Sequence, residues 1–342
     1  MREIKPLTSI RGLFAIYVAI YHIFPRNNSF ISNGYLSVDL FFILSGFIMS
    51  CVYENKFKSG VTFDGYMQFI KGRVARVYPL YLFIIAMISF LYLANNIRTP
   101  STKEYFSLVF FLQSIFIVSN NLVSHAWSIA VEVLAYILFP FTILIIARSR
   151  KYLTPAFCIV ISFAGLIVVS RYGLWGPMDV VTGPLAILRC FCGYLLGMSG
   201  FIILRDYKDK ITPAGVEITL ILACIISLIA LNIKGMDLIT ILGFSLIIPA
   251  LSLSNGLIAK ALSAKPIVYL GEISYSIYLI HYPLCRKLAF IPAWVHKKTG
   301  LLDINIIALI MTICLSMLTY RFVEVPCRNL IKGMRLEQKI LR

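Results

Sequence analysis

The stretch PAGVEITLILACIISLIALN, from Pro213 to Asn232, decides the environment of this chain. Its only charged residue is Glu217, and a helix of about 20 apolar residues spans the hydrocarbon core of a bilayer. Similar runs recur throughout the 342 residues, of which 59% are hydrophobic and 14% charged, with a mean hydropathy of +0.86. Soluble domains have about 45–50% apolar and about 25% charged residues. The sequence therefore predicts an all-α integral membrane protein.

Apolar runs of spanning length predict a bundle of about ten transmembrane helices. They cover roughly 7–25, 36–53, 77–95, 127–147, 153–171, 184–204, 213–232, 238–255, 267–284 and 303–323. A further apolar stretch, 104–118, is too short to span and is predicted to be re-entrant or interfacial. We expect one transmembrane domain, 1–323, followed by a short basic cytoplasmic tail, 324–342.

The distribution of basic residues predicts the orientation of the chain. If 104–118 does not cross, 22 of the 32 Lys and Arg residues lie on the side that carries both termini. Because cytoplasmic loops are enriched in Lys and Arg, both termini are predicted to be cytoplasmic. The net charge of +17 lies in short clusters between apolar runs, which indicates membrane topology rather than nucleic-acid binding. The cysteines are scattered, no CxxC is present, and no metal site is expected.

Ionisable residues within the predicted spans are candidates for function, because each is costly in lipid unless it is paired. Arg11 and His22 lie eleven residues apart on the first span, which brings them to within roughly 20° of one helical face and about 16 Å apart along the axis. Asp39 opens the second span at a depth comparable to that of His22. It could fix the histidine's tautomer, or it could only cap its helix. A snorkelling arginine and a structural histidine are the alternative interpretation.

Arg73 and Arg76 precede the third span at a spacing that places both guanidinium groups on one helical face. Fork-shaped donors at a membrane boundary suit phosphate or pyrophosphate. Ordinary positive-inside anchoring is the alternative, and the pair favours the functional interpretation.

Four other polar residues lie in the spans or at their ends. Glu132 follows Trp127-Ser128 at the start of the fourth span, and His281 lies near the outer end of the ninth. Arg189 is alone in the sixth span and is expected to pair with Glu132 or Asp39. His125 is expected to be a solvated loop residue. Cytoplasmic arginines and outer histidines and carboxylates thus form two poles, which suits group transfer from a cytoplasmic donor to an outer acceptor.

These motifs resemble those of the membrane acyltransferase-3 family, the bacterial integral-membrane O-acyltransferases that modify glycans, and the match covers nearly the whole chain. The stretches that carry the resemblance are Ser9-Ile-Arg11-Gly12-Leu-Phe-Ala15 with the spacing to His22, Val38-Asp39-Leu-Phe-Phe-Ile-Leu-Ser45-Gly46-Phe47, Arg73-Val-Ala-Arg76-Val-Tyr-Pro79, Trp127-Ser128 with Glu132, Gly271 to Pro283, and Phe322-Val-Glu324-Val-Pro326-Cys-Arg328.

The resemblance implies an acetyl-CoA donor and, as acceptor, a glycan hydroxyl of O-antigen or exopolysaccharide on the outer side of the bacterial inner membrane. Arg11, Arg73 and Arg76 would hold the CoA phosphates, and His22 would be the catalytic base, oriented by Asp39 or Glu132. The residues expected to contact the acceptor are His281, Tyr275, Ser45, Trp127 and Arg189.

Some relatives carry a fused C-terminal domain, and this chain is expected to acylate its acceptor directly. Transfer in one step and transfer through an acyl-histidine remain open. The rivals are a glycan or lipid-linked sugar transporter and a non-catalytic membrane sensor or scaffold.

Overall fold

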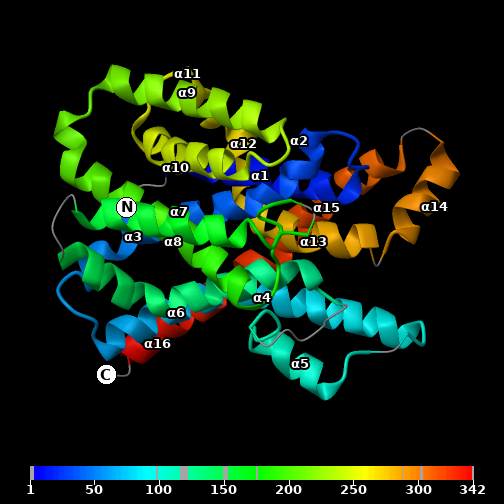
Figure 1. The fold of residues 1–342 in the computed structure, drawn as a ribbon. Helices are drawn as coiled ribbons and strands as arrows, with labels where there is room; N and C mark the ends of the chain where they lie inside the picture. Colours follow the sequence, from blue (N-terminus) through cyan, green and yellow to red (C-terminus); the bar gives the residue numbers. More distant parts are fainter. Residues whose placement is uncertain are drawn as a thin grey trace.

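The computed structural model describes residues 4–97, 99–115, 122–148, 153–174, 176–286, 288–300 and 303–340. Helices account for most of this part of the chain, and it contains no strand. Figure 1 shows the helices packed side by side as one bundle, with their axes inclined to one another. A multi-pass, all-α membrane bundle was predicted, and the fold confirms it.

Within the described ranges, seven helical segments are long and apolar enough to cross a membrane. They are Lys5–Ile23 (α1), Ser29–Phe57 (α2 Ser29–Ser32, η1 Asn33–Leu36 and α3 Ser37–Phe57), Phe63–Ala94 (α4), Ser124–Ala147 (η2 Ser124–Ala126 and most of α6 Trp127–Arg148), Gly183–Lys210 (α8 Gly183–Tyr207 and η3 Lys208–Lys210), Pro213–Leu231 (α9) and Ile304–Ile331 (α15 Ile304–Thr319, η4 Tyr320–Glu324 and part of α16 Val325–Ile340).

The remaining predicted segments are shorter. Leu153–Val169 (α7) and Asp237–Leu253 (α10) are apolar helices of 17 residues each. The segment predicted over 267–284 consists of two helices, Lys265–Glu272 (α12) and Ser274–Arg286 (α13), that meet at Ile273. Of 104–118, residues 104–109 form most of Thr102–Val109 (α5) and turns follow to 115, while 116–118 lie outside the described residues. Leu257–Leu262 (α11) and Phe290–Thr299 (α14) complete the helices.

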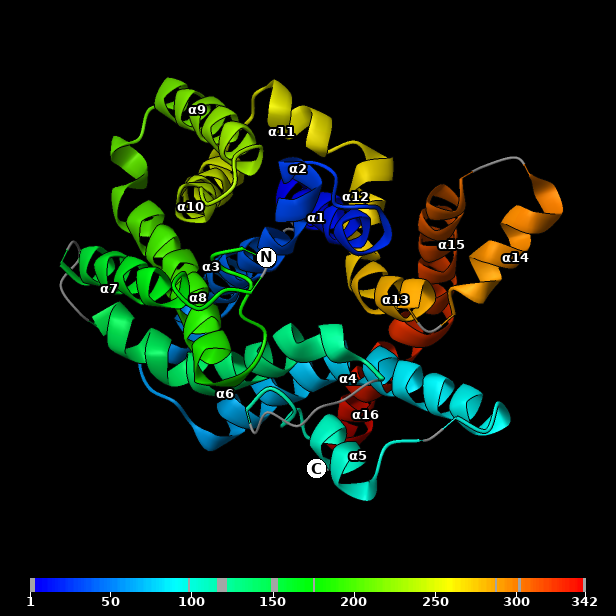
Figure 2. The same cartoon turned by 45° about the vertical axis from the view of Figure 1, so that its right-hand side comes forward.

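Small residues let the central helices approach closely, as is common between helices in membranes. α3 packs against α8, and a Cβ atom on Gly46 would overlap the carbonyl of Tyr194 on α8. A Cβ atom on Gly197 would likewise overlap the carbonyl of Ile43 on α3. Figure 2 shows α3 and α8 between α9 and α10 on one side and α4 and α6 on another. These two glycines therefore fix how α3, which carries Asp39 and Ser45, sits against α8, which carries Arg189.

The break between α12 and α13 lies against α1. Gly271 comes so close to α1 that a Cβ atom would overlap the carbonyl of Thr8. Arg11 bridges the break: its Nη2 donates to the carbonyl oxygen of Gly271 at 3.1 Å and its Nε to Ser274 Oγ at 2.9 Å. Irregular backbone within a membrane protein is tolerated where protein groups satisfy it. Arg11 therefore has a structural role in addition to the binding role that was predicted for it.

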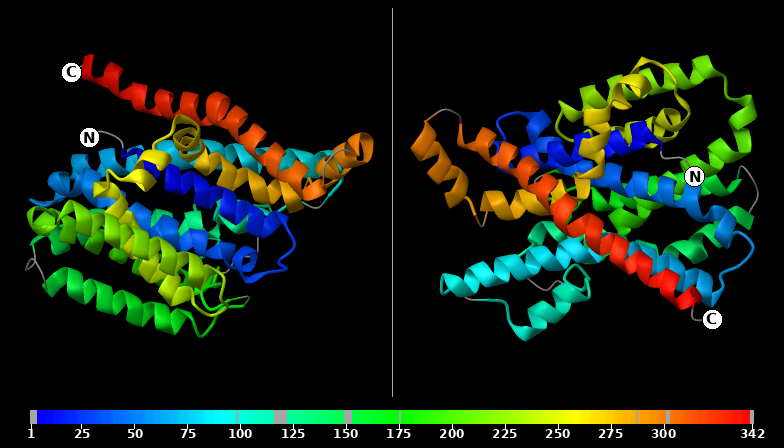
Figure 3. Two further views of the ribbon diagram at one scale, coloured as in Figure 1. Left: turned by 90° about the horizontal axis from the view of Figure 1, so that it is seen from above. Right: turned by 180° about the vertical axis from the view of Figure 1, so that it is seen from behind.

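The last two helices form one long rod, because the five-residue π-helix η4 joins α15 to α16 without a break. Figure 3 shows this rod crossing the bundle and ending near the same end of the molecule at which α1 begins. Glu324, at the end of η4, is only 3% exposed and its Oε2 accepts a hydrogen bond from Ser276 Oγ on α13 at 3.1 Å. The boundary predicted between 323 and 324 therefore does not coincide with a break in the helix, and Glu324 packs with the bundle.

Candidate functional site

Most of the predicted site residues line one of two cavities in the described part of the chain, one near the start of α1 and one near its end. The first, which we call the arginine cavity, has a volume of about 120 Å³ and is lined by Arg11, Arg73, Arg76, Glu132, Ser45 and Tyr275, among others. The second, the histidine cavity, has a volume of about 250 Å³ and is lined by His22, His125, Trp127, Asp179, Arg189 and Arg286, among others. The predicted site residues are thus gathered into two groups.

In the arginine cavity, α4 supplies two half-buried guanidinium groups. Arg73 Nη2 donates to Tyr53 Oη at 3.1 Å, and its Nε is buried without a hydrogen-bond partner among the described residues. Neither Arg73 nor Arg76 has a carboxylate within ion-pair distance in the described part of the chain. Cations that line an apolar cavity without such a partner favour an anionic ligand.

Glu132 also lines the arginine cavity, which corrects the prediction that it lies with His22 in the outer half. Its Oε1 accepts a hydrogen bond of 2.7 Å from Tyr136 Oη, one turn further along α6. The carboxylate therefore faces the arginines. No contact of Glu132 with His22 or Arg189 occurs among the hydrogen bonds of the described residues.

Three histidines from three helical segments meet at the histidine cavity. His22, in the last turn of α1, has its Nδ1 3.2 Å from Nε2 of His281 on α13 and 3.0 Å from the carbonyl oxygen of Val18. His281 is fully buried. Its ring lies 5.3 Å from that of His125 on η2, measured between centroids. The partner of His22 is thus a histidine and not the carboxylate that the sequence suggested.

His125 is a second correction, because it was expected to be a solvated loop residue. It is only 5% exposed, and its ring stacks on Tyr282 at a centroid distance of 4.8 Å. Neither ring nitrogen has a hydrogen-bond partner among the described residues. The sequence signal that could have found it was its position two residues before the Trp127-Ser128 motif, at the start of a span.

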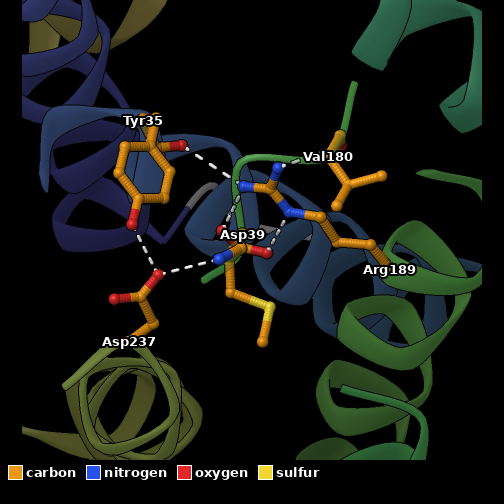
Figure 4. A network of polar contacts seen from close by, with 6 residues as sticks. Tyr35, Asp39, Val180, Arg189 and Asp237 are labelled. Carbon is orange, nitrogen blue, oxygen red and sulfur yellow. Dashed lines mark hydrogen bonds and ion pairs between the residues drawn. The ribbon is translucent and has the colours of Figure 1, made fainter. Parts of the chain in front are cut away.

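Asp39 is engaged with Arg189, which was one of the two pairings predicted for that arginine. Figure 4 shows the guanidinium held by both carboxylate oxygens, with Nε–Oδ1 and Nη2–Oδ2 distances of 2.8 and 2.6 Å. Arg189 and Asp39 are 0% and 2% exposed. The same network includes Tyr35, whose hydroxyl donates to Asp237 Oδ2 at 2.5 Å. Asp39 therefore holds the walls of the histidine cavity together and does not contact His22.

The residues expected to contact the acceptor divide between the cavities. Ser45 and Tyr275 line the arginine cavity, and the Tyr275 hydroxyl donates to the carbonyl oxygen of Val77 at 2.6 Å. Trp127 and Arg189 line the histidine cavity, and the Arg189 guanidinium lies 5.3 Å from the centre of the Trp127 ring. His281 contacts the His22 ring at its Nδ1 atom.

Two residues, Val38 and Tyr278, line both cavities and form the partition between them. The Tyr278 hydroxyl oxygen lies 2.6 Å from Ser128 Oγ and 2.8 Å from the carbonyl oxygen of His125. Because that carbonyl can only accept, Tyr278 donates to His125 and accepts from Ser128. Ser128 and Tyr278 were not among the predicted site residues, because a hydroxyl pair between two helices leaves no spacing signal.

Comparisons with known proteins identify the family of this chain and several of its relatives. The sequence model of a family described as an acyltransferase domain, Acyl_transf_3, matches residues 6–321. O-acetyltransferase OatA of Staphylococcus aureus (strain NCTC 8325 / PS 47) is 24% identical over 369 residues. Peptidoglycan O-acetyltransferase OatA of Listeria monocytogenes serovar 1/2a is 22% identical over 388 residues. The alignments cover 96% and 98% of this chain but 58% of each relative's length. No solved structure gives a significant match.

Proposed function

The chain belongs to the Acyl_transf_3 acyltransferase family, and from this premise we propose that it is a membrane O-acetyltransferase. It transfers an acetyl group from cytoplasmic acetyl-CoA to a hydroxyl of a cell-surface glycan. The observation that carries the proposal is the meeting of the two cavities at a single partition. Arg73 and Arg76, which have no carboxylate within ion-pair distance among the described residues, lie on one side, and His22 lies on the other. A transporter does not need both a phosphate site and a base.

The arginine cavity suits one end of the donor. Its volume of about 120 Å³ is smaller than the ~300–1,000 Å³ of pockets that enclose a drug-sized ligand. Only the thioester arm of acetyl-CoA would lie inside, and the nucleotide phosphates would lie against Arg73 and Arg76 at the mouth. Bidentate guanidinium groups are well matched to phosphate oxygens. Two N–H groups of Arg11 already donate to Gly271 and Ser274, so this residue contributes less to the binding of acetyl-CoA.

The acceptor would enter the histidine cavity, where His22 acts as general base. His22 Nε2 takes the proton of the sugar hydroxyl while the hydroxyl oxygen bonds to the thioester carbon. The carbon–sulfur bond breaks, and His22 returns the proton to the CoA thiolate. General-base assistance of this kind contributes about 10²- to 10⁴-fold. The proposal takes direct transfer as its route; trapping of an acetylated His22 would replace it by a two-step route.

The acceptor class and the location complete the proposal. The chain would lie in the bacterial inner membrane with both termini in the cytoplasm, so that the histidine cavity faces outward. O-antigen and exopolysaccharide are the acceptors that the family resemblance implies, whereas the Listeria relative is named for peptidoglycan. Mass spectrometry of surface polysaccharide and of muropeptides, from cells with and without this chain, decides between these acceptors by the one that loses its acetyl groups.

The test of the activity uses the full chain in lipid nanodiscs with labelled acetyl-CoA and soluble glycan fragments. We expect CoA release that depends on added glycan and transfer of the label to it. His22→Ala should abolish both, whereas His296→Ala, at an exposed position on α14, should not. Near-normal turnover of His22→Ala would remove His22 from the mechanism. Movement of glycan across vesicle membranes without CoA release would support the transporter instead.

A further inference from the structure

His22 and His281 form a hydrogen-bonded pair that joins α1 to α13. Nε2 of His281 lies 3.2 Å from Nδ1 of His22. Each ring also contacts its own helix: Nδ1 of His22 lies 3.0 Å from the carbonyl oxygen of Val18, and Nδ1 of His281 lies 3.1 Å from that of Ile277. Both carbonyls precede their histidine by four residues. The pair therefore uses three of the four ring nitrogens and leaves one, Nε2 of His22, without a partner among the described residues.

These contacts decide where the protons lie. A carbonyl oxygen can only accept, so Nδ1 of His281 must carry a proton to contact Ile277. In a neutral imidazole the other nitrogen, Nε2, then accepts. Nδ1 of His22 must likewise be protonated, because it faces the carbonyl of Val18 and the lone pair of His281 Nε2 at once. Which ring nitrogen is protonated is set by the bond that the other makes. Nε2 of His22 is thus left with its lone pair, and His22 lines the histidine cavity.

We propose that His281 is the positioning residue for His22. It holds the His22 ring in the Nδ1–H form with Nε2 directed at the acceptor, and it accepts from the imidazolium when Nε2 takes up the hydroxyl proton. The inference rests on the proposed function, in which His22 is the base. Carboxylates hold the corresponding place in hydrolase triads. Here the hydrogen-bond acceptor is the neutral imidazole of His281, which is fully buried at 0% exposure. A neutral group avoids the cost of an unpaired charge in lipid.

The two carboxylates that were predicted to orient His22 do not compete for this role. Both oxygens of Asp39 bond Arg189, and Glu132 bonds Tyr136 in the other cavity. His125 contacts the His281 ring without hydrogen-bonding to it. No group of three His, Cys, Asp or Glu side chains in the described residues is arranged to hold a metal ion. His281 is the hydrogen-bonding side chain through which His22 can be oriented.

The test compares His281→Gln, which retains an acceptor oxygen, with His281→Leu, which has none. The protein is the full chain in nanodiscs, and the probes are acetyl-CoA and peptidoglycan glycan fragments. We expect His281→Leu to lower kcat by about 10²-fold and to leave KM for acetyl-CoA unchanged, because His281 does not line the arginine cavity. His281→Gln should recover kcat to within about tenfold of wild type. Equal kcat in wild type and His281→Leu, or equal losses in both variants, would overturn the proposal.

A second measurement does not depend on activity. The chain contains only four histidines, so ring ¹⁵N NMR of histidine-labelled protein in lipid bilayers can report each tautomer, with His296→Leu and His125→Phe assisting assignment. We expect His22 in the Nδ1–H form in wild type and in His281→Gln, and a mixture of tautomers in His281→Leu. A wild-type His22 in the Nε2–H form would refute the assignment. If transfer to glycan fails but the tautomers are as expected, the proposed function falls and the pairing stands.

Discussion

Arg189 and Asp39 form a bidentate ion pair that is almost fully buried, with side chains that are 0% and 2% exposed. The pair joins α8 to α3 at the wall of the histidine cavity (Figure 4). Arg189 also donates to the carbonyl oxygen of Val180 at 3.3 Å, which ties the loop between α7 and α8 to the same point. This pair shapes the cavity in which the acceptor is proposed to bind.

Removing one member of this pair should destabilise the protein more than replacing both. Asp39→Leu leaves the Arg189 charge buried without its partner, which typically costs about 3–5 kcal/mol. The double variant Asp39→Leu/Arg189→Met leaves no unpaired charge and should recover most of that loss. Thermal unfolding in detergent measures the difference. A double variant less stable than either single variant would show that the attraction between the two charges exceeds the free-energy cost of burying them.

The arginines of α4 should act on donor affinity. Arg73→Ala and Arg76→Ala each remove a charged hydrogen-bond donor, which is worth about 1.5–3 kcal/mol or roughly 10- to 100-fold in KM for acetyl-CoA. Lysine at either position should recover part of the affinity, because it keeps the charge but not the fork. Steady-state kinetics on the purified chain provides the measurement. Arg321→Ala, at an exposed position on η4, serves as the control, and unchanged KM in both α4 variants would exclude a phosphate site here.

Arg11 should differ from the α4 arginines. Arg11 donates to the Gly271 carbonyl and to Ser274 Oγ at the break between α12 and α13, and Ser274 Oγ also donates to that carbonyl at 2.7 Å. Arg11→Ala therefore removes two hydrogen bonds from a charged group, each of which contributes about 1.5–3 kcal/mol. We expect a lower unfolding temperature for Arg11→Ala and little change for Arg76→Ala. Equal stability of these two variants would argue that Arg11 has no structural role.

The partition between the cavities should limit unproductive hydrolysis. Tyr278→Phe removes the hydroxyl that joins Ser128 to the His125 carbonyl. If the partition keeps water from the thioester, this variant should release CoA from acetyl-CoA several-fold faster than wild type without glycan. Thiol detection measures the release. Tyr282→Phe, whose ring lines only the histidine cavity, is the matched control, and equal release in both variants would mean that Tyr278 does not separate the cavities.

The close approach of α3 and α8 should tolerate no added methyl group. Gly46→Ala or Gly197→Ala would place a Cβ atom against backbone carbonyls of the facing helix, and overpacking typically costs about 1–3 kcal/mol. At Gly72 on α4 an added Cβ atom would make only an ordinary contact of 4.0 Å with the Tyr53 hydroxyl, so Gly72→Ala should be neutral or stabilising by about 0.5–1 kcal/mol. Unfolding measurements on the three variants test this, and a stable Gly197→Ala would show that the two helices can move apart at little cost.

Much of the fold was predictable, because the lipid constrains the backbone of each apolar segment separately. Long apolar runs have few stable arrangements in lipid other than helices, so the class and most segments were read correctly. The break at Ile273 was not, although Gly271, Glu272 and Ser274 beside it are less apolar than the rest of the predicted span. What allows the break is a contact with α1, where Arg11 satisfies the Gly271 carbonyl, and no local pattern encodes that partner.

The candidate site shows the same division. By itself the sequence determined that Arg11 and His22 share one face of a helix, that Arg73 and Arg76 share another, and that Arg189 needs a carboxylate, since helical periodicity and the cost of burying charge are local rules. Only the tertiary structure decided that Asp39 goes to Arg189, that Glu132 faces the arginines, and that His281 meets His22. Those choices depend on how helices are rotated and which ones are neighbours. Small residues such as Gly46, Gly197 and Gly271 set both the rotation and the neighbours of each helix, through contacts with residues more than a hundred positions away in the chain.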